Sequence, residues 1–167
     1  WPKNANGIYH GLSTMSYAVA NSTNTVSIKI LEELGLSHSF YFLRDSLGLS
    51  DLVERGENES GAFITDMDYA AMGLGQLNYG LTVRDITAAY SIFADNGVYH
   101  PPRSYYRVEN SFGEVILEKA TVSEQVISDE NAEIIISTAR NNAVFFIFFL
   151  FIFRTVRTIR SLRYIFS

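Results

Sequence analysis

The sequence predicts an α+β fold that is mostly helical and carries a few antiparallel strands. Apolar residues recur at helical spacing in several separate segments, whereas residues 105–118 alternate around a turn-forming Asn110–Gly113. The length of 167 residues suits a single domain. A hydrophobic content of 47% excludes a disordered chain.

Three short helices are expected after an extended loop over residues 1–12. Ser13 or Thr14 is a suitable N-cap for the first helix, which runs to about Ala20. The third spans Ser39 to Leu47. The second has an apolar face formed by Val26, Ile30, Leu31 and Leu34, and Gly35 ends it.

The middle of the chain contains the clearest helix, from Thr82 to Asp95. Thr82 is a good N-cap, and Asp85 lies three residues later, close to a capping box. Residues 54–66, by contrast, are polar and contain glycine, which predicts an exposed loop.

The last expected elements are a hairpin, a strand and a helix. Two alternating segments, 105–109 and 114–118, form the hairpin, and Val126-Ile127 is a further short strand. Ser128 then caps a helix over about Asp129–Arg140.

The composition changes abruptly at residue 141. All 18 acidic residues precede it, and residues 1–140 have a net charge of -9, whereas residues 141–167 carry four arginines and no acid. The apolar run 143–153 is shorter than the ~20 residues that a transmembrane helix requires. Residues 141–167 are therefore interpreted as an atypical apolar and basic tail, frame-shifted or otherwise non-native. The alternatives are a membrane-surface segment and a native core element.

Several kinds of chemistry are excluded by the residues present. The absence of cysteine rules out disulfides, thiolate metal sites and cysteine nucleophiles. The net charge of -5 gives no indication of nucleic-acid binding. Gly73-Leu74-Gly75 is followed by Asn78 rather than glycine, so the dinucleotide fingerprint fails. No cofactor and no metal site is expected, and the carboxylates of Glu32-Glu33 and Asp66-x-Asp68 are expected to be solvated.

Ser22-Thr23-Asn24 is the single Ser-x-Asn sequence in the chain. Alone it predicts no more than a helix cap and a turn, since both residue types favour such positions. Its surroundings, together with a second block, are more specific: Pro2-Lys3-Asn4, Gly7–Gly11, Ala18–Thr25, Met72–Gly75, Tyr79–Thr82 and Ala88–Pro102.

In this order and spacing, these segments resemble the transpeptidase domain of bifunctional (class A) penicillin-binding proteins. The resemblance covers roughly residues 1–140, with Tyr90–Pro102 as its most specific part. It implies the transpeptidase fold that penicillin-binding proteins share with serine β-lactamases, in which a helical subdomain lies beside an antiparallel sheet. Residues 1–140 would then be a partial transpeptidase domain, which should leave apolar surface exposed.

The resemblance also implies an activity. In this family a serine of a Ser-x-x-Lys motif attacks the D-Ala-D-Ala carbonyl of a peptidoglycan stem peptide, and β-lactams acylate the same serine. By position, Ser22 would relay a proton toward the leaving amine, and Asn24 would bind the substrate amide. The location implied is the extracytoplasmic face of the bacterial membrane, through an anchor outside this chain.

The sequence departs from the family at its other two motifs. None of the three lysines has a serine three residues before it, and no Lys-Thr-Gly occurs. The chain alone is therefore expected to be a catalytically incomplete fragment. The alternatives are a non-catalytic module that binds peptidoglycan or a partner, and a membrane-surface protein led by the tail.

Overall fold

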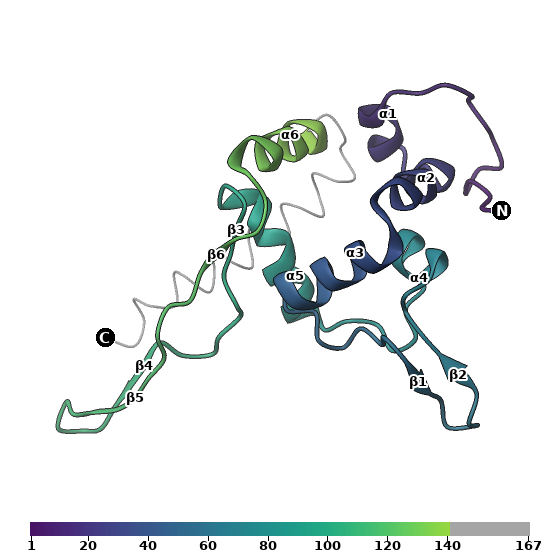
Figure 1. The fold of residues 1–167 in the computed structure, drawn as a ribbon. Helices are drawn as coiled ribbons and strands as arrows, with labels where there is room; N and C mark the ends of the chain where they lie inside the picture. Colours follow the sequence, from purple (N-terminus) through teal and green to yellow (C-terminus); the bar gives the residue numbers. More distant parts are fainter. Residues whose placement is uncertain (141–167) are drawn as a thin grey trace.

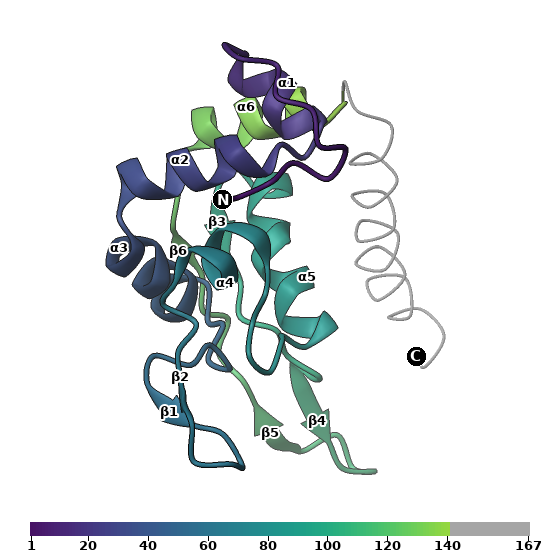
Figure 2. The ribbon, with the colours of Figure 1, turned by 90° about the vertical axis from the view of Figure 1, so that its right-hand side faces the viewer.

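The structure, a computed structural model, describes residues 1–140. The expectations for residues 141–167 lie outside this range. Helices form most of the regular secondary structure in the described chain, and two β-hairpins project from the end opposite to the first and last helices (Figures 1 and 2). The mixed helical and antiparallel architecture confirms the predicted fold class.

The first helix begins and ends as predicted, whereas the second begins two residues before its expected start at Val26 and ends as predicted. Helix α1 (Met15–Ala20) is capped by Thr14, whose side-chain oxygen accepts a hydrogen bond from the Tyr17 amide at 3.2 Å. Helix α2 (Asn24–Leu34) ends at Gly35, where φ is +84°. This left-handed conformation is open to glycine at little steric cost, so the chain reverses there.

The third helix begins earlier than predicted. Helix α3 (Leu36–Tyr41) starts directly after Gly35 and continues into the π-helical segment η1 (Phe42–Ser46). The expected start at Ser39 was wrong because a single glycine both ends α2 and opens α3.

Residues 54–66 form a hairpin, which corrects the expected loop. Strand β1 (Gly56–Glu57) pairs antiparallel with β2 (Phe63–Ile64). The side-chain oxygen of Asn58 accepts hydrogen bonds from the Ser60 and Ala62 amides and so closes the turn. Two-residue strands are too short to produce a recognisable alternation.

Helix α4 (Tyr69–Leu74) was not predicted. It has only six residues, and Gly73 within it lowers its helix propensity. Packing explains the glycine, because a Cβ there would lie 2.5 Å from Cδ1 of Ile28 in α2. Asp68 caps the helix by accepting hydrogen bonds from the amides of Ala70 and Ala71.

The carboxylate of Asp66 is buried, with 1% of the residue exposed, so its expected solvation was wrong. Its oxygens accept hydrogen bonds from the Val53 amide at 2.9 Å and from the Asn78 amide and side chain at 2.8 and 2.7 Å. Three donors replace the water that burial removes.

The clearest predicted helix is α5 (Val83–Ser91), continued by the 3-10 turn η2 (Ile92–Ala94). Thr82 caps it as predicted, with its Oγ1 accepting from the Asp85 amide at 3.1 Å. The predicted hairpin is also present, as β4 (Arg107–Glu109) paired with β5 (Val115–Glu118).

The last strand and helix close the described chain. Strand β6 (Glu124–Gln125) lies two residues before its predicted position and pairs with β3 (Val98–Tyr99), 26 residues upstream. Helix α6 (Asp129–Arg140) follows its Ser128 cap and lies beside α1 (Figure 2).

The main core lies between α3, η1, α5 and β3, and its buried members are Phe40, Leu47, Leu49, Leu52, Ala89, Ile92 and Tyr99. As expected, large apolar side chains such as Trp1, Leu12 and Phe112 are exposed elsewhere. Among the described helices, none is both long enough and apolar enough to cross a membrane.

Candidate active site

Ser22 lies in the turn between α1 and α2, exposed on the surface. Its φ is +48°, a left-handed conformation that non-glycine residues rarely adopt and that functional turns often contain. The Ser22 amide donates to the Val19 carbonyl at 3.2 Å. Its hydroxyl has no hydrogen-bond partner within residues 1–140, which leaves both its donor and its acceptors available.

Asn24 is the first residue of α2, two positions beyond Ser22. Its side-chain Nδ2 donates to the Lys3 carbonyl at 2.9 Å. Among the described residues its Oδ1 has no partner, so that oxygen remains an open acceptor. The turn therefore presents a free hydroxyl and a tethered amide at the N-terminus of one helix.

Asn4, in the N-terminal segment, is hydrogen-bonded to the residue that follows this turn. The residue is 8% exposed, and its Oδ1 accepts from the amide of Thr25 at 3.1 Å and from the hydroxyl of Thr25 at 3.2 Å. Its Nδ2 donates to the Ile8 carbonyl at 2.8 Å. With Asn24 bound to Lys3, the N-terminal segment is attached to the turn at two adjacent residues.

Sequence reasoning had not assigned a role to Asn4. The signal available was its place in Pro2-Lys3-Asn4, which belongs to the block that contains the Ser-x-Asn sequence. The contact with Thr25 spans 21 residues, so no local pattern reveals it.

Ser22 does not have the surroundings of an activated nucleophile. Within the described range, no lysine or histidine side chain is hydrogen-bonded to its hydroxyl, and activation of a serine requires an adjacent base. The turn instead offers a hydroxyl that can both donate and accept a hydrogen bond and an amide oxygen that can accept one. Nor is any group of three or more His, Cys, Asp or Glu in residues 1–140 placed to hold a metal ion.

Within residues 1–140, no carboxylate or histidine side chain is hydrogen-bonded to the side chain of Ser22 or Asn24. Glu32 and Glu33 are exposed on α2, as expected. His10 packs edge-on against Tyr17 of α1, with ring centroids 5.6 Å apart. His100 comes directly after β3 and lies 2.7 Å from the carboxylate of Asp95, which precedes that strand.

Comparison with known proteins identifies relatives of this chain. The family model described as the penicillin-binding protein transpeptidase domain matches residues 1–142. Penicillin-binding protein 1A of Clostridium novyi is 37% identical over 135 residues, which are 80% of this chain and 14% of the relative. Penicillin-binding protein 4 of Bacillus subtilis is 27% identical over 128 residues, 76% of this chain and 18% of the relative.

A solved structure shares the fold. Penicillin-binding protein 3 from Mycobacterium tuberculosis, determined in complex with aztreonam, superposes with a TM-score of 0.60 at 21% sequence identity. The match covers 82% of this chain and 32% of that one. The present chain thus spans a minor part of each relative, and that part contains the Ser22 turn.

Proposed function

Because the chain belongs to the penicillin-binding protein transpeptidase family, we propose that residues 1–140 are part of a serine-type D-Ala-D-Ala transpeptidase. Such an enzyme cross-links peptidoglycan stem peptides through an acyl-enzyme. The serine oxygen bonds to the carbonyl carbon of the penultimate D-Ala, the peptide C–N bond breaks, and the terminal D-Ala leaves with a proton on its amine. The observation that carries the proposal is the Ser22–Asn24 turn within a family match over residues 1–142.

In this proposal Ser22 passes the proton to the leaving amine. Its exposed hydroxyl has no partner in the described structure, so it is able to accept one hydrogen bond and donate another. The left-handed backbone at Ser22 sets the direction of its Cα–Cβ bond before substrate binds. A preset direction reduces the entropic cost of reaching the reactive geometry.

Asn24 orients the substrate in the same proposal. Its amide nitrogen is held by the Lys3 carbonyl, which leaves Oδ1 to accept from a peptide N–H of the substrate or from an ammonium group. Asn4 acts as a positioning residue, since it binds the amide and hydroxyl of the next residue, Thr25. A stem peptide ending in D-Ala-D-Ala is the proposed substrate, and β-lactams are the proposed inhibitors of the intact domain.

The 167 residues alone do not supply the nucleophile. Three residues before Lys29 and Lys119 lie Val26 and Ile116, and no Lys-Thr-Gly is present. Incubation with a fluorescent penicillin, followed by intact-mass measurement, should therefore show no covalent adduct. A stoichiometric adduct would refute this part of the proposal and would mean that a serine of this chain is activated in an unrecognised way.

Grafting tests the proposed roles directly. The matched segment of the Clostridium novyi protein would be replaced by residues 1–140 of this chain, and acylation by fluorescent penicillin measured. We expect the chimaera to be acylated. Ser22→Ala should reduce transpeptidation by about 100-fold, the lower range for loss of a positioned proton carrier.

Ser13→Ala is the matched control for the graft, since Ser13 is an exposed loop residue just before α1. It should leave the activity unchanged. A chimaera that binds peptidoglycan equally well with and without Ser22, yet never transfers an acyl group, would instead support the non-catalytic binding module. The extracytoplasmic location and the membrane anchor outside this chain are part of the same proposal.

A further inference from the structure

Two Asn-Gly pairs occur in the sequence, Asn6-Gly7 and Asn96-Gly97. Asparagine is chemically labile, and glycine after it leaves the next backbone nitrogen unshielded, because glycine has no Cβ. A β-branched residue follows each pair, Ile8 in one case and Val98 in the other. Since the two local sequences are so similar, a difference in their reactivity would come from the fold.

Asn6-Gly7 lies in an exposed turn of the N-terminal segment. The side-chain Oδ1 of Asn6 accepts a hydrogen bond from the Ile8 amide at 3.0 Å. This bond closes a ring of atoms that contains both Cγ of Asn6 and the nitrogen of Gly7, so the two atoms are held near each other. The Ile8 amide also stabilises the negative charge that develops on Oδ1 when a nucleophile attacks Cγ.

The surroundings of Gly7 offer little resistance to such an attack. A Cβ built on Gly7 would meet no atom within 4 Å, so the space on that side is open. The Gly7 amide donates to the Asn4 carbonyl at 2.9 Å, and this N–H must be released before the nitrogen attacks. Because Gly7 is exposed, water replaces that hydrogen bond at little cost.

Asn96-Gly97 is held more firmly. Gly97 is buried, and its amide donates to the Ile92 carbonyl at 2.7 Å. Its own carbonyl accepts from the amides of Val126 and Ile127 at 3.0 and 3.3 Å. A Cβ built on Gly97 would overlap the Ile127 carbonyl oxygen, so the chain is closely packed there.

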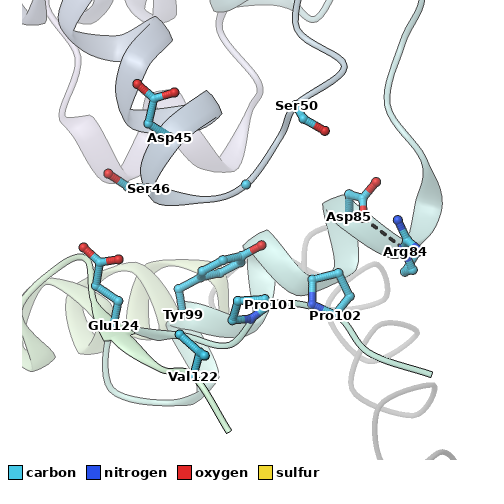
Figure 3. A pocket seen from close by; sticks show the side chains of 11 residues that line it. Asp45, Ser46, Ser50, Arg84, Asp85, Tyr99, Pro101, Pro102, Val122 and Glu124 are labelled. Atoms are coloured by element: carbon cyan, nitrogen blue, oxygen red, sulfur yellow. Dashed lines mark hydrogen bonds and ion pairs between the residues drawn. The ribbon is translucent and has the colours of Figure 1, made fainter. Parts of the chain in front are cut away.

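The β3–β6 ladder, which begins directly after Gly97, forms one wall of a pocket of about 340 Å³ whose lining includes Tyr99 and Glu124 (Figure 3). Neither Asn96 nor Gly97 is among the lining residues. The pocket therefore does not expose the Gly97 amide, and attack by this nitrogen requires its backbone hydrogen bonds to open first.

We propose that Asn6-Gly7 is a site of spontaneous deamidation, with water as the co-reactant. The Gly7 nitrogen loses its proton to water and bonds to Cγ of Asn6, the Cγ–Nδ2 bond breaks, and ammonia leaves. Water then adds to one carbonyl of the resulting succinimide and opens one C–N bond of the ring. The product is aspartate or isoaspartate, and in isoaspartate the main chain runs through Cγ and is one carbon longer.

The modification changes the segment that is attached to the Ser22 turn. Asn6-Gly7 lies inside the loop that is closed by the hydrogen bond from Nδ2 of Asn4 to the Ile8 carbonyl, at 2.8 Å. The same Asn4 side chain accepts from the amide and hydroxyl of Thr25. An additional main-chain carbon lengthens the loop and so weakens the contact between Asn4 and Thr25.

The test compares the two pairs within the full chain, incubated at mildly alkaline pH in water labelled with heavy oxygen. Peptide mass spectrometry with electron-transfer fragmentation measures the conversion of each asparagine and distinguishes aspartate from isoaspartate. We expect Asn6 to convert at least about tenfold faster than Asn96 in the folded chain, because only Asn96 requires local opening. Each product should carry one heavy oxygen. In the urea-unfolded chain the two rates should lie within about threefold of each other.

Hydrogen exchange at the Thr25 amide measures the structural consequence. In the deamidated fraction, separated by ion exchange, this amide should exchange at least about threefold faster than in the unmodified chain. Freshly prepared Asn6→Asp adds the charge without the additional carbon, and its exchange should stay within about twofold of the unmodified chain. Asn6→Gln should abolish conversion at residue 6 and keep Thr25 exchange constant during incubation.

Equal conversion of Asn6 and Asn96 in the folded chain would overturn the proposal, as would a difference that persists in urea. Products without heavy oxygen would exclude the succinimide route. Unchanged exchange at Thr25 in the deamidated fraction would reject the effect on the turn. None of these measurements depends on acyl transfer, so their outcome is separate from that of the Ser22 graft test.

Discussion

The helical part around Phe40 and the β4–β5 hairpin are stabilised in different ways. Phe40 is fully buried, and helices and loops from residues 36 to 99 surround it. All four residues of β5, by contrast, are exposed, although three of them are Val115, Ile116 and Leu117. One region excludes water from its apolar side chains, and the other does not.

The hairpin is shaped instead by its own turn. The side-chain oxygen of Asn110 accepts from the amides of Phe112 and Glu114 at 2.9 and 3.0 Å, and Gly113 supplies a φ of +79°. These contacts are local, so the hairpin forms its shape without contributing much to global stability. Alternating apolar residues therefore indicate a strand, but they do not indicate that the strand is buried.

The largest expected effect comes from truncation in the core. Phe40→Ala should lower the free energy of unfolding by about 3–5 kcal/mol, since it removes a buried ring and leaves a cavity. Ile116→Ala should change it by less than about 0.5 kcal/mol. Urea unfolding followed by circular dichroism measures both. Equal losses for the two variants would show that the hairpin packs against a partner in solution.

The second comparison is between two side chains that accept hydrogen bonds from backbone amides, Asp66 in the helical part and Asn110 in the hairpin turn. Asp66→Ala leaves three N–H donors of Val53 and Asn78 without their acceptor, so we expect a loss of about 2–4 kcal/mol in global stability. Asn110→Ala also removes an acceptor of backbone amides, but only within one turn. Hydrogen exchange should show protection lost throughout the helical part for Asp66→Ala, and in residues 110–114 alone for Asn110→Ala.

Hydrogen bonds between residues close in sequence could be predicted, whereas those between distant residues could not. Caps at Thr14, Thr82 and Ser128 were predictable because donor and acceptor lie three residues apart. Asp66 was expected to be solvated because its donors lie 12 and 13 residues away. Helix α4 was missed for a related reason, since its glycine makes sense only against Ile28 of α2.

At the candidate site, too, sequence separation decides which contacts could be predicted. Ser22 and Asn24 were recognisable as a motif because several short segments, from Pro2-Lys3-Asn4 to Ala88–Pro102, occur in the family's order and spacing. The hydrogen bonds that Thr25 donates to Asn4 join residues 21 positions apart, and no local sequence pattern indicates them. The pocket beside Tyr99 combines residues 45–50, 84–85 and 99–124, which no local pattern connects.

A smaller effect is expected at the N-terminal segment. Asn4→Ala should lower stability by about 1–2 kcal/mol, because a buried side chain loses its hydrogen bonds to Thr25 and Ile8. It should also speed hydrogen exchange at the Thr25 amide. Asn6→Ala, at an exposed residue whose oxygen accepts only from the Ile8 amide, is the control. If Thr25 exchange is unchanged, Asn4 does not hold the turn.

The smallest effect concerns two short ion pairs, one in each region. Glu54 accepts from the Tyr41 hydroxyl at 2.8 Å and lies 2.5 Å from Arg44, and both contacts hold the pKa of Glu54 below its ordinary value of 4.5. A carboxyl whose pKa is lowered by folding stabilises the protein above the unfolded value and loses this contribution as pH falls through the folded value. Stability should therefore decline below about pH 4.5 in the parent chain, and less steeply in Glu54→Gln.

The hairpin has its own pair, Arg107 with Glu109, also at 2.5 Å. Both partners are about half exposed, and neither is hydrogen-bonded to a tyrosine of the packed helices. Glu109→Gln should consequently change the stability at neutral pH little, because exposed pairs contribute little in water. Urea midpoints measured from pH 3 to pH 7 compare the two variants. Equal losses of stability in Glu109→Gln and Glu54→Gln would mean that distance, rather than attachment to the packed helices, decides what an ion pair contributes here.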